Sequence, residues 1–157
     1  MTYSLGLASR AELSGVHRDL VRVVERAISI SAVDFAVHDG IRTVAEQKRI
    51  VAAGVSRTMK SKHLEGVAVD LVPVVEDKLR WWWSQIYQVA AAMHQAARDL
   101  GVTIRWGVVW DRTLNELAPG IDDPALLAEA LRKEGLAYNA RHPGSDFPDG
   151  PHFELVA

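Results

Sequence analysis

The chain has 157 residues, of which 18 are basic and 20 acidic, so its formal net charge at neutral pH is −2. This length suits one domain with a single core, and the near balance of charge argues against nucleic-acid binding and against electrostatic attachment to anionic membranes. The absence of cysteine excludes disulfides, thiolate metal sites and cysteine nucleophiles.

The first helical pattern covers residues 9–30. Ser9 and Glu12 have the spacing of a capping box, and Gly15 is expected to divide the segment into a turn and a longer helix. His17 falls on this helix and is interpreted as structural. No basic start with a long apolar core precedes the segment, and no apolar run reaches the roughly 18 residues of a membrane span. We therefore expect neither an export signal nor stable membrane attachment.

A strand over residues 34–38 is followed by a helix, and Arg42 lies between the two. Thr43 and Glu46 form a second capping box, which predicts that the helix begins immediately after Arg42 and stops at Gly54. Loops at such junctions commonly line functional sites. A fixed guanidinium there could bind a substrate carboxylate or stabilise a tetrahedral oxyanion, although its position alone favours a solvated arginine.

The segment SKHLEGVAVD, residues 61–70, carries two candidate metal ligands. Gly66 permits a tight bend, and the alternating run behind it predicts a strand that shows Asp70 on one face. A turn carrying His63 can then fold over that face. Ser61, two positions before His63, is placed to donate a hydrogen bond to a substrate backbone.

The strongest helical pattern covers residues 81–100, where apolar residues form one stripe that ends at Gly101. It opens with three consecutive tryptophans, a triplet that also fits a carbohydrate platform. Because Trp83 lies on the apolar stripe, core packing is favoured for it. A strand over 102–106 follows.

The stretch 111–147 is long for a connection and contains a helix of its own. Asp123 and Pro124 are typical of a helix start, and Gly135 is expected to end this helix. We interpret the whole segment as a lid or rim where substrate choice is set.

The late segment DGPHFE, residues 149–154, supplies further candidates. Gly150 and Pro151 predict a turn that delivers His152 to the start of a last strand over 152–156. A catalytic zinc takes three imidazole or carboxylate ligands and leaves a fourth position open.

His63, Asp70 and His152 are therefore the predicted zinc ligands. Asp149, across the turn, is the predicted general base. From the residue types alone, a structural role for these side chains stays open.

The joint pattern SxHxxGxAxD with a late DxPHFEL-like segment resembles the VanY-like zinc D,D-carboxypeptidase and L-alanyl-D-glutamate endopeptidase family, and most closely its phage peptidoglycan endolysins. The resemblance extends through residues 15–21, 34–47 and 106–107, so it covers most of the chain. It implies one α+β domain over 1–157, with an antiparallel sheet flanked by helices and a zinc cleft, as in the hedgehog and D-Ala-D-Ala peptidase folds.

The resemblance also implies roles for individual residues. It assigns one Zn²⁺ to His63, Asp70 and His152, a substrate or transition-state role to Arg42, and a substrate contact to Ser61. Trp106 is expected to wall the cleft together with Trp110. Where the family often has a WGGDW-like phrase, this sequence has Val108 and Val109, so a role for the missing acid cannot be carried over.

These expectations describe a phage-type endolysin that hydrolyses the L-alanyl-D-glutamate bond of the peptidoglycan stem peptide during host lysis. The resemblance implies a monomer made in the host cytoplasm that reaches the wall through a separate membrane pore. Two alternatives stay open: a D-alanyl-D-alanine carboxypeptidase or dipeptidase, and a non-catalytic zinc-binding module that recognises the wall.

Overall fold

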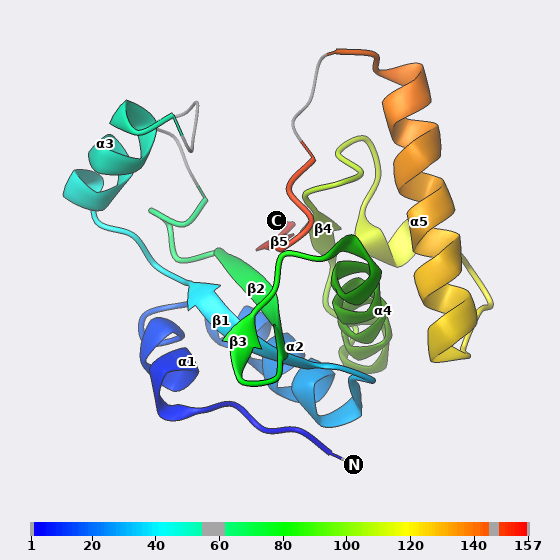
Figure 1. Ribbon diagram of the computed structural model, residues 1–157, viewed down its shortest axis with the longest axis horizontal. Helices are drawn as coiled ribbons and strands as arrows, with labels where there is room; N and C mark the ends of the chain where they lie inside the picture. Colours follow the sequence, from blue (N-terminus) through cyan, green and yellow to red (C-terminus); the bar gives the residue numbers. More distant parts are fainter. Residues whose placement is uncertain (1, 55–61, 145–147, 157) are drawn as a thin grey trace.

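The computed structural model describes residues 2–54, 62–144 and 148–156, and within them an antiparallel sheet forms the centre of the molecule (Figure 1). The strands follow the order β1-β2-β5-β4, and β3 pairs with the far end of β2. Their bounds are β1 Asp34–Asp39, β2 Ala68–Val75, β3 Lys78–Leu79, β4 Ile104–Trp106 and β5 His152–Leu155. The expected α+β fold is thereby confirmed.

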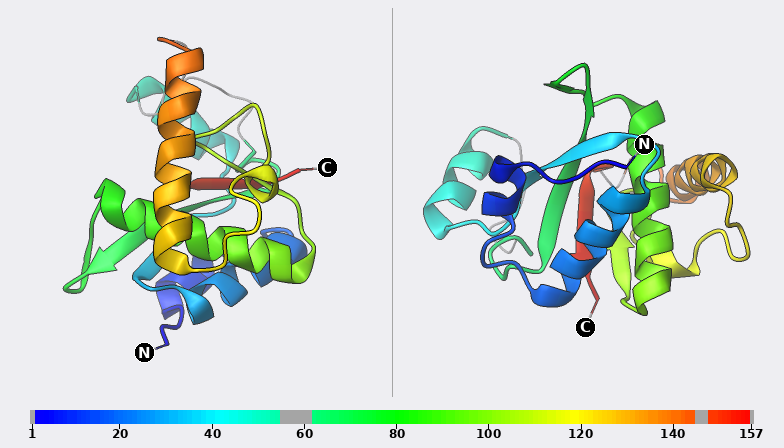
Figure 2. Two further views of the ribbon diagram at one scale, coloured as in Figure 1. Left: turned by 90° about the vertical axis from the view of Figure 1, so that its right-hand side faces the viewer. Right: turned by 90° about the horizontal axis from the view of Figure 1, so that it is seen from below.

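Helices cover one face of this sheet. Two of them, α2 and α4, pack against each other there, while α5 lies along the outer side of α4 and α3 projects away from the layer (Figure 2). The helical segments are α1 Leu7–Glu12, α2 Arg18–Ile30, α3 Val44–Ala52, α4 Trp83–Leu100, the 3-10 helix η1 Leu114–Glu116 and α5 Pro124–Arg141. None of the helices described is both long and apolar enough to cross a membrane.

Side-chain alternation in the central strands separates the core from the functional face. Val69 and Leu71 of β2 and Phe153 of β5 are buried in the main hydrophobic core. Asp70 and His152 are their neighbours in sequence, so they point to the other side of the sheet. The helices therefore stabilise one face and leave the other for polar groups.

The N-terminal helix differs from the sequence expectation. α1 begins at Leu7, with Gly6 as its N-cap, so the predicted capping box at Ser9 is wrong. Ser9 is buried instead, and its hydroxyl accepts a hydrogen bond of 3.0 Å from the Val37 backbone N–H. The division near Gly15 and the Thr43 cap of α3 are confirmed.

The predicted end of α5 at Gly135 is also wrong, because the helix continues to Arg141. Gly135 is a contact residue here: a Cβ at this position would lie 2.7 Å from a methyl of Val108. Leu131 and Tyr138 of the same helix are buried in the core. α5 is thus a packed layer, while the role of 111–147 as a rim for substrate choice stays a prediction.

Candidate metal centre

Strand pairing brings Asp70 and His152 together. The two residues are directly opposite each other in the β2–β5 register, and the Leu71 N–H donates to the Pro151 carbonyl at 2.9 Å. His63 approaches from the turn before β2, where Gly66 adopts φ 70° and accepts a hydrogen bond of 2.8 Å from the His17 N–H. His63, Asp70 and His152 are called the candidate metal centre below.

The spacing of the donor atoms in this centre suits a small cation. Asp70 Oδ1 lies 3.4 Å from His63 Nε2 and 3.5 Å from His152 Nδ1, and the donor atoms all lie within 4.8 Å of one another. In a tetrahedral zinc site with bonds of about 2.0–2.1 Å, neighbouring ligand atoms lie roughly 3.3–3.4 Å apart. Asp70 Oδ1 is buried and has no hydrogen-bond partner among the described residues. The centre could therefore hold a metal ion.

The outer ring nitrogens are held by the protein. His63 Nδ1 lies 2.7 Å from the Gly40 carbonyl oxygen, and His152 Nε2 lies 2.8 Å from Glu154 Oε1. Because a carbonyl and a carboxylate accept, each of these nitrogens is the one that donates, and the other nitrogen of each ring faces the centre. Glu154 had no role assigned from the motif alone, and its position two residues after His152 in β5 puts both side chains on one strand face.

Gly40 is required where it accepts from His63. A Cβ at Gly40 would overlap the carbonyl oxygen of Glu12 and would approach a methyl of Val16 to 3.2 Å. Any side chain here would therefore move the loop after β1. The same loop is tied to the centre by the Arg42 N–H, which donates to the His63 carbonyl at 3.0 Å.

The electrostatics of the centre favour an ionised carboxylate. Burial opposes the charge on Asp70, but the two imidazoles outweigh it and hold the pKa of Asp70 well below its ordinary value. Burial likewise opposes the charge on His152, yet Asp70 and Glu154, one at each ring nitrogen, raise the pKa of His152 to about 10 in the absence of a metal. A cation at the centre would replace that proton on His152.

Asp149 lies beside the centre, as expected, and its pKa is shifted in the opposite direction from that of Asp70. Burial, reinforced by the charge of Asp70, raises the pKa of Asp149 to about 6. Its N–H donates to the Gly107 carbonyl at 2.9 Å, and its own carbonyl accepts from the His152 N–H at 3.0 Å. A Cβ at Gly107 would lie 2.9 Å from His152 Cβ and 3.1 Å from Asp149 Cβ. Glycine at 107 thus lets this turn pack closely against β4.

Arg42 is a buried part of this network rather than a solvated side chain. Its guanidinium donates to Asp39, to Gln47 Oε1 at 2.9 Å and to Asp70 Oδ2 at 3.3 Å, and its side chain is 10% exposed. Asp70 therefore directs one oxygen to the centre and the other to Arg42. The sequence placed Arg42 near the site but gave no sign of this contact.

The three remaining candidates have different outcomes. Trp106 was expected to wall the cleft, but it is 0% exposed and its indole N–H donates to the Gly150 carbonyl at 2.8 Å, so it supports the turn from inside the core. Trp110 does lie at the site, with its ring 5.6 Å from that of His152. Ser61 lies outside the described residues.

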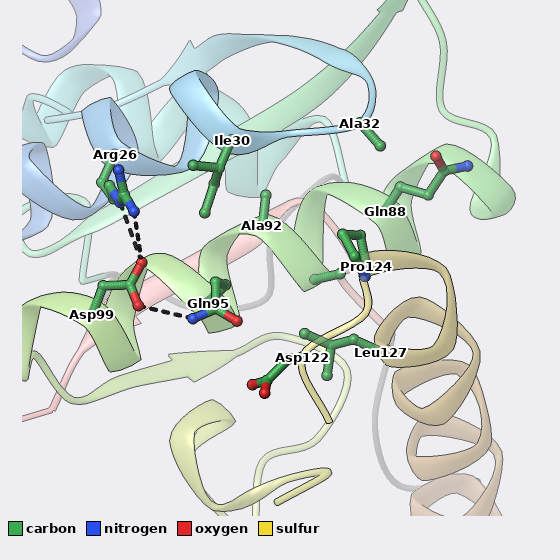
Figure 3. Close-up of a pocket in the computed structure, with 11 residues that line it drawn as sticks. Arg26, Ile30, Ala32, Gln88, Ala92, Gln95, Asp99, Asp122, Pro124 and Leu127 are labelled. Atoms are coloured by element: carbon green, nitrogen blue, oxygen red, sulfur yellow. Dashed lines mark hydrogen bonds and ion pairs between the residues drawn. The ribbon is translucent and has the colours of Figure 1, made fainter. Parts of the chain in front are cut away.

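A hollow of about 310 Å³ between α2, α4 and the start of α5 is separate from the candidate metal centre (Figure 3). Its walls include Ile30, Ala92 and Leu127, and Arg26 and Asp99 form an ion pair of 3.1 Å at its edge. No residue of the candidate metal centre lines it.

Fold and site together define a class. An α+β protein with a His-Asp-His donor set, and a buried carboxyl group of raised pKa beside it, has the equipment of a metal-dependent hydrolase. The model of the phage L-alanyl-D-glutamate peptidase family matches residues 1–123, and the chain belongs to this family.

Individual relatives agree with that assignment. The chain is 34% identical over 119 residues to the L-alanyl-D-glutamate peptidase of Escherichia phage T5, an alignment that covers 71% of this chain and 84% of the relative. It is also similar to the crystal structure of the L-Ala D-Glu endopeptidase ChiX of Serratia marcescens, with a TM-score of 0.69 and 33% identity over 97% of this chain and 90% of that one. The family-model match ends at residue 123, whereas the structural likeness extends to the later segment that carries Asp149 and His152.

Proposed function

We propose that this protein is a zinc-dependent peptidoglycan endopeptidase that hydrolyses the bond between L-alanine and D-glutamate in the stem peptide. Family membership supports the substrate, because the family and both relatives bear this activity in their names. The observation that carries the chemistry is the buried His-Asp-His donor set, in which Asp70 Oδ1 lies 3.4 and 3.5 Å from the two imidazole nitrogens.

Zinc is the metal we infer for the centre. Two imidazoles and one carboxylate, with no thiolate and no further carboxylate among the donors, form a set that zinc hydrolases use. When bound, zinc lowers the pKa of water to about 7 and polarises a carbonyl group. His63, Asp70 and His152 would hold it, each oriented by a second partner.

The remaining residues move the proton and stabilise charge. Asp149 accepts a proton from the attacking water and delivers it to the leaving amine of D-glutamate. Arg42 orients Asp70 by donating to its second carboxylate oxygen, and it would place a positive charge beside the oxyanion that forms at the scissile carbonyl. Ser61 is proposed to hold substrate backbone. The protein would act as a monomer on peptidoglycan after release through a separate membrane pore.

Digestion of a defined disaccharide-pentapeptide tests the proposal. The products, separated and weighed by mass spectrometry, should be the disaccharide-L-alanine and a peptide that begins with D-glutamate. Release of terminal D-alanine instead would identify the D-alanyl-D-alanine alternative. Stoichiometric binding to sacculi without any new amino groups would identify a non-catalytic wall-recognition module.

Substitution of the proposed base tests the mechanism. Asp149→Asn should keep stoichiometric zinc and lose at least about 100-fold in kcat, because proton transfer typically contributes that much. Asp122→Asn is the matched control, since Asp122 is exposed and pairs with Arg98 far from the centre. Full activity of zinc-loaded Asp149→Asn would remove Asp149 from the mechanism.

A further inference from the structure

Three consecutive exposed tryptophans stand between β3 and the first turn of α4. Trp81, Trp82 and Trp83 are 52%, 50% and 41% exposed, so the core packing expected for Trp83 is wrong. We call these three residues the indole ledge. Exposed apolar side chains scattered singly over a surface are normal, whereas several neighbouring ones are typical of an interaction surface.

Neighbouring side chains hold the indole ledge in place. The Arg80 guanidinium lies over the Trp82 ring, 4.9 Å from its centroid, and His38 meets Trp81 edge-on with ring centroids 5.3 Å apart. Trp83 packs against Tyr87 at 5.5 Å. The Arg80 N–H also donates to the Pro73 carbonyl at 2.8 Å, which fixes the backbone before the ledge. Ordered indoles lose little entropy when they bind a ligand.

One residue of the indole ledge contacts the turn that carries Asp149 and His152. Trp83 ring atoms lie 2.9 and 3.3 Å from the position that a Cβ would occupy on Gly150, in the turn between Asp149 and His152. At its other end Trp81 contacts His38, whose neighbour Asp39 binds Arg42. In Figure 1 this segment runs from β3 to the start of α4.

The chemistry of the proposed substrate predicts which part of it lies near the indole ledge. L-alanine is joined through its nitrogen to the lactyl group of muramic acid, and the bond to be cut is formed by the carbonyl of that same alanine. One extended residue spans only about 3.5 Å, and the lactyl linker adds a similar length. The first sugar therefore lies close to the metal and within reach of the protein surface around it. A flat indole offers a hydrophobic face to the C–H groups of a sugar ring.

We propose that the indole ledge binds the glycan strand of peptidoglycan and makes the enzyme prefer stem peptides that are still attached to sugar. The inference rests on the proposed function for the position of the scissile bond. The contact of Trp83 with the turn at Gly150 favours the glycan over a lipid surface, because the sugar is the part of the substrate next to the alanine at the scissile bond.

The test compares two substrates and matched variants of Trp82, whose ring lies under the Arg80 guanidinium. The substrates are a disaccharide-tetrapeptide and the same tetrapeptide without sugar. Trp82→Leu keeps an apolar side chain but loses the ring, and should lower kcat/KM on the disaccharide-tetrapeptide about tenfold, mostly through KM.

The free tetrapeptide should be cut at an unchanged rate by Trp82→Leu. Trp82→Phe, which keeps an aromatic face, should restore most of the sugar-dependent rate. Leu126→Ala is the control for loss of an exposed apolar side chain elsewhere, on α5. Equal losses on both substrates, or no loss on either, would overturn the proposal.

Binding experiments separate the ledge from the proposed function. Peptide-free glycan chains should bind to the EDTA-treated wild type, detected by tryptophan fluorescence, and should bind much more weakly to Trp82→Leu. If the wild type cuts neither substrate, the proposed function fails. Glycan binding by the wild type, weakened in Trp82→Leu, would then support the ledge proposal by itself, and the lack of such binding would overturn it. Unchanged glycan binding by Trp82→Leu together with lost binding to anionic lipid vesicles would make the ledge a membrane surface and overturn the proposal.

Discussion

Glu154 shows how a single side chain determines the geometry of a metal ligand. It is buried, and its carboxylate lies 2.8 Å from His152 Nε2, so it fixes both the ring orientation and the nitrogen that faces Asp70. His63 has an uncharged counterpart in the Gly40 carbonyl. Carboxylate-histidine-metal arrangements of this kind raise the basicity of the ligand.

Replacing this carboxylate should weaken metal binding without removing a ligand. We expect Glu154→Gln to lower zinc affinity roughly 10–100-fold, measured by competition with a chromophoric chelator. Glu129→Gln, which changes an exposed ion pair with Arg132 on α5, is the control and should bind zinc normally. Unaltered affinity in Glu154→Gln would mean that strand pairing alone orients His152.

The raised pKa of Asp149 predicts the acid side of the pH profile. A base must be ionised to accept a proton, and burial with the nearby charge of Asp70 raises the pKa of Asp149 to about 6. Activity should therefore be present above that pKa and lost as the pH falls through it, by about tenfold per pH unit. A bound cation favours the carboxylate, so in the zinc enzyme the midpoint should lie at or below pH 6.

The measurement is kcat/KM against pH at saturating zinc, with zinc content determined at each point. Loss of metal at low pH would otherwise imitate the loss of the base, because protons compete for the imidazoles. A zinc-loaded enzyme whose rate stays constant far below pH 4 would contradict the assignment of Asp149.

At the scale of the elements, α5 packs closely against the turn after β4 through Gly135. A methyl of Val108 lies 2.7 Å from where a Cβ on Gly135 would be. This contact explains why a glycine is tolerated inside a long helix.

The contact between Val108 and Gly135 predicts that the effect of Gly135→Ala on the free energy of unfolding changes sign with the residue at 108. Gly135→Ala should destabilise the protein by about 1–2 kcal/mol, because overpacking against Val108 exceeds the gain of up to about 1 kcal/mol in helix propensity. In a Val108→Ala background the same change should become stabilising. Urea unfolding of the four proteins measures this, and additive effects of the two substitutions would show that the residues do not interact.

At the scale of the whole molecule, the hydrophobic core and the candidate metal centre are on opposite faces of the sheet. Core residues such as Leu20, Met93 and Phe153 are fully buried without any help from the centre. A domain of 157 residues also buries enough surface to fold without a metal. The centre should thus add stability to a protein that is already folded.

Metal removal should therefore lower the melting temperature without unfolding the chain. With free zinc at about 100 times Kd, binding contributes about 2.7 kcal/mol, or roughly 5–10 °C in Tm for a chain of this size. Calorimetry with EDTA and with zinc measures the shift, and His63→Ala should show none. Loss of helical circular dichroism at 25 °C on adding EDTA would contradict this separation of core and centre.

The sequence by itself determined the parts that depend on local spacing. His63 and Asp70 could be identified because a bend and an alternating strand join them, and Asp149 and His152 because a Gly-Pro turn does. The Thr43 cap, the start of α5 and the C-terminal end of α4 before Gly101 followed from backbone preferences of short segments. Family membership followed from two such motifs found in one chain.

Only the tertiary structure decided what each face touches. Periodicity placed Trp83 on an apolar stripe, and a glycine suggested a helix end at 135, but Trp83 is exposed beside Gly150 and Gly135 is buried against Val108. Trp106 received its partner, the Gly150 carbonyl, from a chain segment that meets it only when β4 pairs with β5. The physical reason is that a periodic pattern reports the direction of a side chain from its own element, whereas burial and contact depend on the other elements that pack there.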